Sequence, residues 1–288
     1  MIQHLKRVLS SWPVGLFAAL LVLAVSTPSA RAQDAYSIGI VPQFEARKLT
    51  AIWTPILEEV SKRAGVTLTM QGSPKIPEFE KHFAKGDFDF AYMNPYHALV
   101  AHAEQGYEPI IRDGGRELFG VLVVRKDAPY KTVEDLRGKN IAFPAPNALG
   151  ASLLMRAVLQ REHALSYEAN FVNTHSSAYF NVVLGEAAAA GGVMGTLRSL
   201  DPKVRDQLRV LFETPRLPPH PIMVHPRVPL EVRNRVAEAF LALAASPEGQ
   251  KLMERIPMRA ATPATMQDYD KIRKLDLDAF YQASDPTD

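Results

Sequence analysis

The sequence predicts an α/β protein built from two lobes, with the second lobe inserted into the first. Short β-type runs alternate with helical stretches from residue 36 onward, and this pattern restarts after Pro129. A proline-rich stretch at 215–221 then leads back to further strand and helix segments. Such alternation is typical of a mostly parallel sheet covered by helices. Two crossing segments, near Phe119–Val123 and Leu211–Pro215, would join the lobes as a two-segment hinge beside a ligand-binding cleft.

The first lobe is predicted to comprise residues 33–121 and 215–288. Ile52, Ile56 and Val60 recur at helical spacing before Gly65, a residue type that tolerates the positive φ found at helix ends. Pro95 suits the first turn of another helix. We expect strands at 36–41, 66–70, 87–92, 109–111, 118–124 and 222–224, and helices at 50–64, 77–85, 95–105, 228–245, 247–255 and 266–281.

The second lobe is predicted to comprise residues 122–214. Thr132 followed three residues later by Asp135 indicates a helix start in which the threonine caps the first turn. A glycine-rich apolar run after residue 189 and the apolar run RVLFE near its end both suit buried strands. We expect strands at 140–143, 170–173, 190–194 and 209–213, and helices at 150–160 and 177–184.

The first 32 residues have the pattern of a signal peptide. Lys6 and Arg7 precede an apolar run at 14–25, and Ala30-Arg31-Ala32 fits the small-x-small cleavage rule before Gln33. This run spans about 18 Å as a helix, which is short against the ~30 Å hydrocarbon core that a membrane anchor must cross. A secreted chain without cysteine suits the periplasm of a Gram-negative bacterium.

Composition and motif searches argue against several functions. The 33 Lys and Arg against 31 Asp and Glu leave no excess of the kind that nucleic-acid binding requires. The absence of cysteine excludes disulfides, thiolate metal ligands and a cysteine nucleophile. His97 and His102 are five residues apart, and His220 and His225 lack a nearby acid, so no metal site is predicted. No nucleophile elbow, phosphate loop or zinc-protease motif occurs. We expect a protein without a cofactor that is not an enzyme.

Five motifs occur in a fixed order along the chain: Gly86 to Ala91 (GDFDFA) followed by Asn94-Pro95; 119–126 (FGVLVVRK); 133–139 (VEDLRGK); 141–150 (IAFPAPNALG); and 173–177 (NTHSS) with Val183 to Gly185. In this order and spacing the chain resembles the PhnD-like family, the periplasmic substrate-binding proteins of phosphate, phosphite and phosphonate ABC transporters. The likeness extends roughly from Tyr36 to Tyr281. It implies a periplasmic binding protein fold of type II, in agreement with the inserted-lobe reading.

The resemblance also implies where a ligand binds. The family holds its oxyanion at the start of a second-lobe helix, where free N–H groups and a partial positive charge attract anions. The matching helix start here is Asn147, Ala148, Leu149 and Gly150, and the partner turn is His175, Ser176 and Ser177. Both would sit at the carboxyl ends of parallel strands. Ser176 and Ser177 fit a helix cap as well as a ligand donor, and Asn147 fits a turn-shaping role.

The first lobe offers three further candidates just past its third strand. Tyr92, Asn94 and Tyr96 alternate there, so all three could face the cleft. Tyr96 fits core packing equally well.

The chain departs from the phosphonate binders at four places. A Ser-Thr-Ser run is replaced by the residues from Asn147 to Leu149, a first-lobe tyrosine falls at Ile76, a hinge aromatic is Phe119 without a hydroxyl, and an aspartate that would hold an ammonium group falls at Ala188. Losing two bonds to a charged group would cost ~3–6 kcal/mol, against a total of about 8 kcal/mol for a micromolar site. These changes argue for altered specificity, and against an amine-bearing ligand in particular.

The sequence therefore predicts a periplasmic substrate-binding protein of an ABC transporter that captures a small oxyanion. It would act as a monomer, close around the ligand and dock on the membrane permease. The alternative is a ligand-sensing module for a membrane histidine kinase, which the sequence does not separate from transport.

Overall fold

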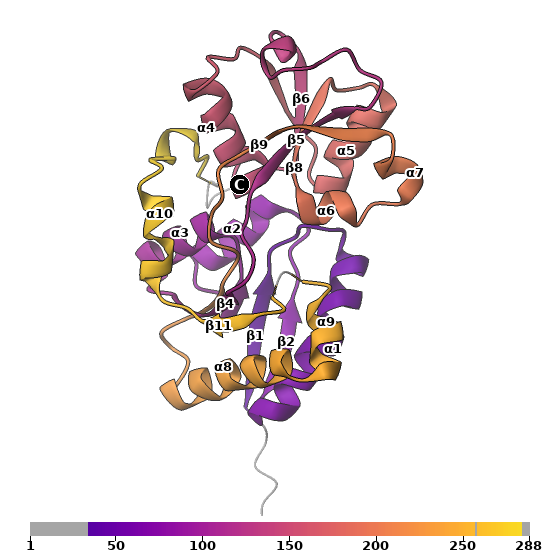
Figure 1. The fold of residues 1–288 in the computed structure, drawn as a ribbon. Coiled ribbons are helices and arrows are strands. Elements are labelled where there is room, and N and C mark those ends of the chain that lie inside the picture. The colour runs from indigo at the N-terminus through magenta and orange to yellow at the C-terminus, as the bar shows by residue number, and fades with distance from the viewer. Residues whose placement is uncertain (1–33, 257, 284–288) are drawn as a thin grey trace, which may run out of the picture. The chain divides into compact units, whose positions relative to one another are not determined.

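The computed structural model describes residues 34–256 and 258–283. The predicted signal peptide and its cleavage site therefore lie outside the described residues. Within these ranges the strands form two separate sheets (Figure 1). We refer to the first sheet with its helices as the first lobe and to the second sheet with its helices as the second lobe. No helix in the described ranges has both the length and the apolar character needed to cross a membrane.

The first lobe is built on a sheet with the order β11-β4-β10-β3-β1-β2. Its strands are β1 (Ala35–Ile40), β2 (Thr67–Gln71), β3 (Phe90–Tyr92), β4 (Glu108–Asp113), β10 (Ile222–Val224) and β11 (Ala261–Pro263). Its helical segments are α1 (Ala46–Ala64), α2 (Ile76–Ala84), α3 (Pro95–Gln105), α8 (Leu230–Ala245), α9 (Pro247–Met253), η3 (Met266–Tyr269), α10 (Asp270–Arg273) and η4 (Asp278–Phe280). Helix α1 buries Ile52, Ile56 and Val60 on one face, as their spacing predicted.

The second lobe is built on a sheet with the order β7-β6-β8-β5-β9. Its strands are β5 (Gly120–Arg125), β6 (Asn140–Phe143), β7 (Glu168–Phe171), β8 (Ala189–Val193) and β9 (Leu208–Glu213). Its helical segments are η1 (Glu134–Leu136), η2 (Leu149–Leu153), α4 (Leu154–Arg161), α5 (His175–Leu184), α6 (Met194–Arg198) and α7 (Pro202–Arg205). Alternate residues of β5 pack on opposite faces, Val121 and Val123 toward α5 and Leu122 and Val124 toward α4. Helices thus cover both faces of this sheet.

The chain passes between the two sheets through two paired segments. The first follows β4 and the second follows β9, and they meet at Leu118 and Leu217. The amide of each of these residues donates to the carbonyl of the other, at 2.8 Å in both cases. One step further along, the Gly120 amide donates to Thr214 Oγ1 at 2.8 Å. The two predicted crossings are therefore joined by hydrogen bonds rather than running separately, while the predicted lobe boundaries at 121/122 and 214/215 stay predictions.

Both sheets are mixed: most strands of each sheet point in one direction, as the expectation of mostly parallel sheets requires, but antiparallel pairs occur in both. β1 pairs in parallel with β2 and β3, but β10 runs antiparallel between β3 and β4. In the second sheet β6 pairs in parallel with β7 and β8, whereas β5 runs antiparallel to β8 and β9. The strands that run against the others are β10 and β11 in the first sheet and β5 in the second. β5 and β10 are the first strands after the two crossings, so neither follows a βαβ connection.

Two predicted helices are shorter than expected. The segment after Thr132 forms only the single turn η1, and the side chain of Asp135 accepts from the amides of Lys131 and Thr132 instead of leaving Thr132 to cap a helix. Gly138, with φ +72°, ends this turn. The helix predicted at 266–281 is broken into η3, α10 and η4, and Asp276 interrupts it with φ +48°. A positive φ at a non-glycine residue cannot continue a right-handed helix.

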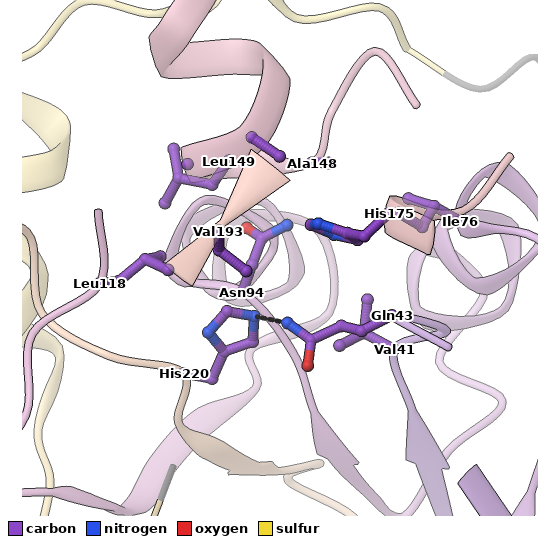
Figure 2. Close-up of a pocket in the computed structure, with 12 residues that line it drawn as sticks. Val41, Gln43, Ile76, Asn94, Leu118, Ala148, Leu149, His175, Val193 and His220 are labelled. Atoms are coloured by element: carbon purple, nitrogen blue, oxygen red, sulfur yellow. Dashed lines mark hydrogen bonds between the residues drawn. The ribbon is translucent and has the colours of Figure 1, made fainter. Parts of the chain in front are cut away.

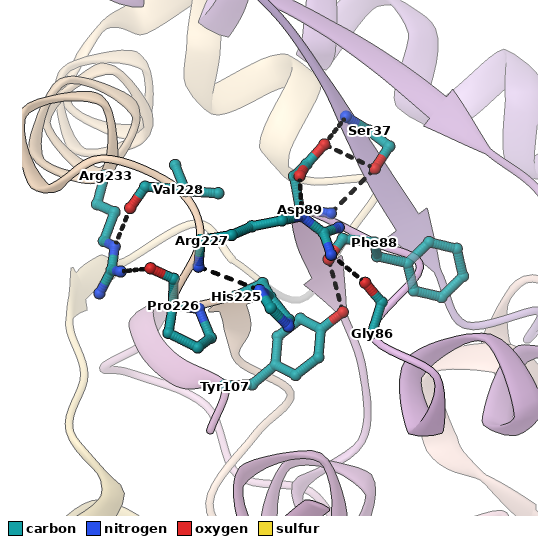
Figure 3. Close-up of polar contacts among 10 residues, drawn as sticks. All are labelled: Ser37, Gly86, Phe88, Asp89, Tyr107, His225, Pro226, Arg227, Val228 and Arg233. Carbon is teal, nitrogen blue, oxygen red and sulfur yellow. Dashed lines mark hydrogen bonds and ion pairs between the residues drawn. The ribbon is translucent and has the colours of Figure 1, made fainter. Parts of the chain in front are cut away.

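Asp89 connects the chain before β3 to the chain after β10 (Figure 3). Its carboxylate accepts from the Ser37 amide at 2.8 Å and from Arg227 Nε at 2.6 Å. Arg227 also donates to the Gly86 carbonyl. Burial raises the pKa of Asp89, but the hydrogen bonds from Ser37 and Arg227 outweigh burial and hold the pKa below its usual value. The motif from Gly86 to Ala91 therefore anchors the returning half of the first lobe.

Gly120 allows the hinge-side end of β5 to touch the start of η2. A Cβ built on Gly120 would lie 1.9 Å from the Gly150 carbonyl oxygen, whereas a Cβ on Gly195 would meet nothing within 4 Å. We expect Gly120→Ala to lower the free energy of unfolding by about 1–3 kcal/mol, since the backbone must move apart. Gly195→Ala, within α6, is the matched control and should be neutral or stabilising by up to about 1 kcal/mol. Urea denaturation of both variants measures the difference, and equal midpoints would contradict the close contact.

Candidate functional site

A cavity lies between the two lobes at the start of η2 (Figure 2). Its lining residues are Val41, Gln43, Ile76, Asn94, Leu118, Ala148, Leu149, Gly150, Ala151, His175, Val193 and His220. No Lys, Arg, Asp or Glu occurs among these described lining residues. The free space is about 20 Å³ for the centre of a water-sized molecule, which is about enough for one water. The cavity is therefore small and without a fixed charge, and its lining combines four polar side chains with apolar ones.

The start of the helix formed by η2 and α4 supplies free backbone donors. The amides of Ser152 and Leu153 both donate to the Ala148 carbonyl, at 2.7 and 3.1 Å. The amides of Leu149, Gly150 and Ala151 precede these, and no described residue accepts a hydrogen bond from them. The first amides of any helix lack a partner within the helix. Here three of them come from residues that line the cavity, at the positive end of the helix dipole.

His175 faces the same space from the first turn of α5. Thr174 caps this helix, its Oγ1 accepting from the Ser177 amide at 3.0 Å. The His175 side chain is 3% exposed, and its Nδ1 has no hydrogen-bond partner among the described residues. Burial lowers the pKa of His175 to about 4. His175 is thus a neutral ring with an unpaired nitrogen beside a potential anion site.

His220 lies on the first-lobe side of the cavity, in the segment that returns from the hinge. Its Nε2 is 3.1 Å from Gln43 Nε2. Its ring stacks on Tyr92, with 5.3 Å between ring centroids. Burial, together with the neighbouring His97 and His175, lowers the pKa of His220 to about 3. Sequence reasoning considered His220 only as a metal ligand and did not single out Gln43. The one sequence feature that could have indicated a role for His220 is its position in the proline-rich stretch at 215–221, which returns from the hinge.

Asn94 joins the two lobes beneath the cavity. Its Oδ1 caps α3 by accepting from the amides of Tyr96 and His97, both at 2.9 Å. Its Nδ2 donates to the Asn147 carbonyl at 3.2 Å. Asn94 is one of the lining residues, together with Ala148, Leu149, Gly150 and His175 from the sequence-predicted set.

The structure does not bring the other sequence-predicted residues into the lining. Asn147 Nδ2 donates to Glu80 Oε2 at 3.0 Å and to the Gln282 carbonyl at 2.6 Å, so its amide faces the end of the chain. Tyr96 directs its hydroxyl to Asp278 Oδ1 at 2.5 Å. Tyr92 lies behind the His220 ring. Ser177 bonds to Thr174, and Ser176 is half-buried outside the lining.

The described residues contain no cluster of three His, Asp or Glu side chains that could hold a metal ion. Within the cavity lining, the polar side chains are two histidines and two amides. Such a set donates hydrogen bonds and, on protonation of a histidine, gains positive charge. The arrangement can therefore bind an anion reversibly.

The two buried histidines make stability depend on pH. An unfolded histidine has a pKa near 6.5, above the folded values of about 4 for His175 and about 3 for His220. The unfolded chain therefore binds more protons, and stability rises with pH between about 4 and 6.5. We expect the free energy of unfolding to fall by roughly 2 kcal/mol per histidine from pH 7 to pH 5. Denaturant melts across this range measure it, and His175→Gln should remove about half of the fall; an unchanged slope in this variant would contradict its burial as a neutral group.

Comparison with known proteins identifies related chains. Residues 38–269 match the family described as ABC transporter, phosphonate, periplasmic substrate-binding protein. The phosphonates-binding periplasmic protein of Escherichia coli (strain K12) is 21% identical over 267 residues, which cover 85% of this chain and 79% of that protein.

Solved structures share the fold. A binding protein component of an ABC phosphonate transporter from Pseudomonas aeruginosa has a TM-score of 0.77 at 17% identity, covering 85% of this chain and 86% of its own. A Prochlorococcus marinus protein in complex with methylphosphonate has a TM-score of 0.76 at 15% identity, covering 84% and 97%. A Xanthomonas citri protein bound to ATP has a TM-score of 0.70 at 16% identity, covering 88% and 100%. The predicted two-lobed α/β fold of a periplasmic binding protein is confirmed.

Proposed function

Because this chain belongs to the family of periplasmic substrate-binding proteins of phosphonate ABC transporters, we propose that its interlobe cavity captures a small oxyanion of the phosphonate, phosphite or phosphate type. The proposal depends on one observation. The amides of Leu149, Gly150 and Ala151, which lack a partner among the described residues, line the same cavity as His175, whose Nδ1 also lacks a partner. Both belong to residues that line one cavity, and both can donate a hydrogen bond, His175 when its ring hydrogen is on Nδ1. An oxyanion satisfies them together, because each of its oxygens accepts several hydrogen bonds.

The lining restricts the ligand further. No described acidic side chain lines the cavity, so an ammonium group on the ligand would lack a partner there. Val41, Ile76, Leu118 and Val193 form apolar walls that suit a hydrogen or a methyl substituent. Hydrogen bonds to charged groups contribute ~1.5–3 kcal/mol each. Three or four such bonds from Leu149, Gly150, Ala151 and His175 reach the ~8 kcal/mol of a micromolar site.

The small size of the cavity implies that the lobes part to admit the ligand. Leu149 and His175 come from the second lobe, and Gln43 and His220 from the first, so only the closed state offers all contacts. Closure is favoured only by the difference in ligand affinity between closed and open states. The closed form, as a monomer, would then dock on the permease in the inner membrane. The alternative role as a sensor module has no support among the related proteins, whose names are those of transport components.

Calorimetry with a panel of anions tests the ligand class. We expect methylphosphonate, phosphite or phosphate to bind with micromolar affinity or better, and 2-aminoethylphosphonate to bind at least tenfold more weakly, because its ammonium group finds no acid. Binding of a neutral or cationic compound with no heat from any oxyanion would reject the proposal.

Replacement of His175 tests its place as a donor. His175→Ala should weaken oxyanion binding at least tenfold, about 1.4 kcal/mol, through the loss of one charge-assisted hydrogen bond. Ser176→Ala is the matched control, since Ser176 is adjacent in the chain but outside the lining, and should bind as the parent does. Equal affinities for the two variants would remove His175 from the site.

A further inference from the structure

A dianion in this cavity faces a problem of charge balance. The described lining residues include no Lys or Arg, and the starts of η2 and α5 each offer only about half a positive charge, less in total than a dianion carries. Burying an uncompensated charge away from water is unfavourable. The only lining side chains that can become cationic are His175 and His220. One of them must supply the missing charge if the ligand binds as a dianion.

The surroundings of the two histidines separate their roles. His175 is the first residue of α5, so a positive charge on it would oppose the positive end of its own helix. His220 lies between β9 and β10, outside any helix. Burial and the neighbouring histidines hold the pKa of His220 below that of His175 in the empty protein, so protonation of His220 needs the charge of a bound ligand. Unlike His175, His220 meets no opposing helix dipole and has Gln43 as a partner for the added proton, so His175 serves as a neutral donor.

Gln43 allows His220 to hold either protonation state. With the ring neutral, Gln43 Nε2 donates to His220 Nε2 across 3.1 Å, which leaves the ring hydrogen on Nδ1. With the ring protonated, a half-turn of the Gln43 amide presents Oε1, which accepts from the new Nε2–H. Gln43 can act as a donor or as an acceptor, so it can keep its hydrogen bond to His220 in either protonation state.

We propose that His220 takes up a proton from solvent when an oxyanion enters the cavity, and that this uptake selects dianionic ligands over monoanionic ones. The inference rests on the proposed function. The proton goes to Nε2, and the attraction between the imidazolium and the ligand is doubled for a dianion. A monoanion gains less from the same protonation, so the neutral ring remains favoured beside it.

Other groups near His220 determine the protonation state of its ring before a ligand binds. His175 on α5 and His97 on α3 both disfavour a charge on His220 through space. His97 is itself bonded to Glu80 of α2 at 2.9 Å. Tyr92 stacks on the ring, and Asp113, Arg116 and Tyr269 act on Tyr92 from behind. Together with burial, these neighbours keep the ring neutral in the empty protein, so the charge appears only with the ligand.

Calorimetric titration of the full mature chain with methylphosphonate, in buffers of different ionisation enthalpy at one pH, measures the protons taken up. Protons taken by the ligand itself count equally in every variant. We expect His220→Gln to take up about half to one proton fewer than the parent. His82→Gln is the matched control, because His82 lies on the exposed part of α2 and pairs with Asp87. The preference for methylphosphonate over methylsulfonate should fall at least tenfold in His220→Gln only.

A second measurement uses the parent protein and does not depend on a variant that folds. The histidine Cε1–H signals in NMR spectra near pH 7 should show one additional imidazolium on saturation with methylphosphonate, and none with methylsulfonate. Tight methylphosphonate binding without that signal, or with equal proton uptake in parent and His220→Gln, overturns the inference while leaving the proposed function intact. No heat with methylphosphonate, phosphite or phosphate overturns both.

Discussion

The contact between the second sheet and the start of η2 determines the geometry of the cavity. Gly120 of β5 faces the Gly150 carbonyl, and Gly191 of β8 faces the Ala151 carbonyl, in both cases closer than any side chain would allow. The helix start is thus held directly against the backbone of two strands. Because the hinge pair Leu118 and Leu217 leads into the same end of β5, the donors of the cavity and the hinge share one rigid support.

The polar side chains that line the cavity beside this helix start carry no fixed charge. Glu80 is a buried acid near the cavity, but it is bonded to His97 and Asn147 and is absent from the described lining. Keeping this acid outside the lining would avoid repelling the proposed anion, while its bond from Asn147 still holds that side chain in place. Electrostatic selectivity then falls on groups whose charge can change, since backbone amides alone attract any anion.

The family resemblance pointed to the helix start at Gly150 and the turn at His175, and the local strand pattern placed each of them after a strand. The helix start at Gly150 and the turn at His175 follow the parallel neighbours β6 and β7, as the positions of their strands indicated. Contacts between distant segments escaped prediction. Gln43 and His220 are 177 residues apart, and Asn147 meets Gln282 across 135 residues. No periodicity or motif encodes such pairs. The first pair forms only when the two halves of the first lobe pack together, and the second only when the C-terminal segment packs on the second lobe.

Hydrogen bonds to the backbone of the C-terminal segment at 275–282 hold it against the second lobe, while Leu277 is buried and Asp278 accepts from Tyr96 in the first lobe. Arg156 donates to the Phe280 carbonyl, Arg161 to the carbonyls of Leu275 and Asp276, and Asn147 exchanges hydrogen bonds with the backbone of Gln282. A grip on carbonyl groups does not depend on which side chains the segment carries. Exposed side chains of this segment can therefore change while the tether between the lobes persists, provided that Arg156, Arg161 and Asn147 and the buried Leu277 stay the same.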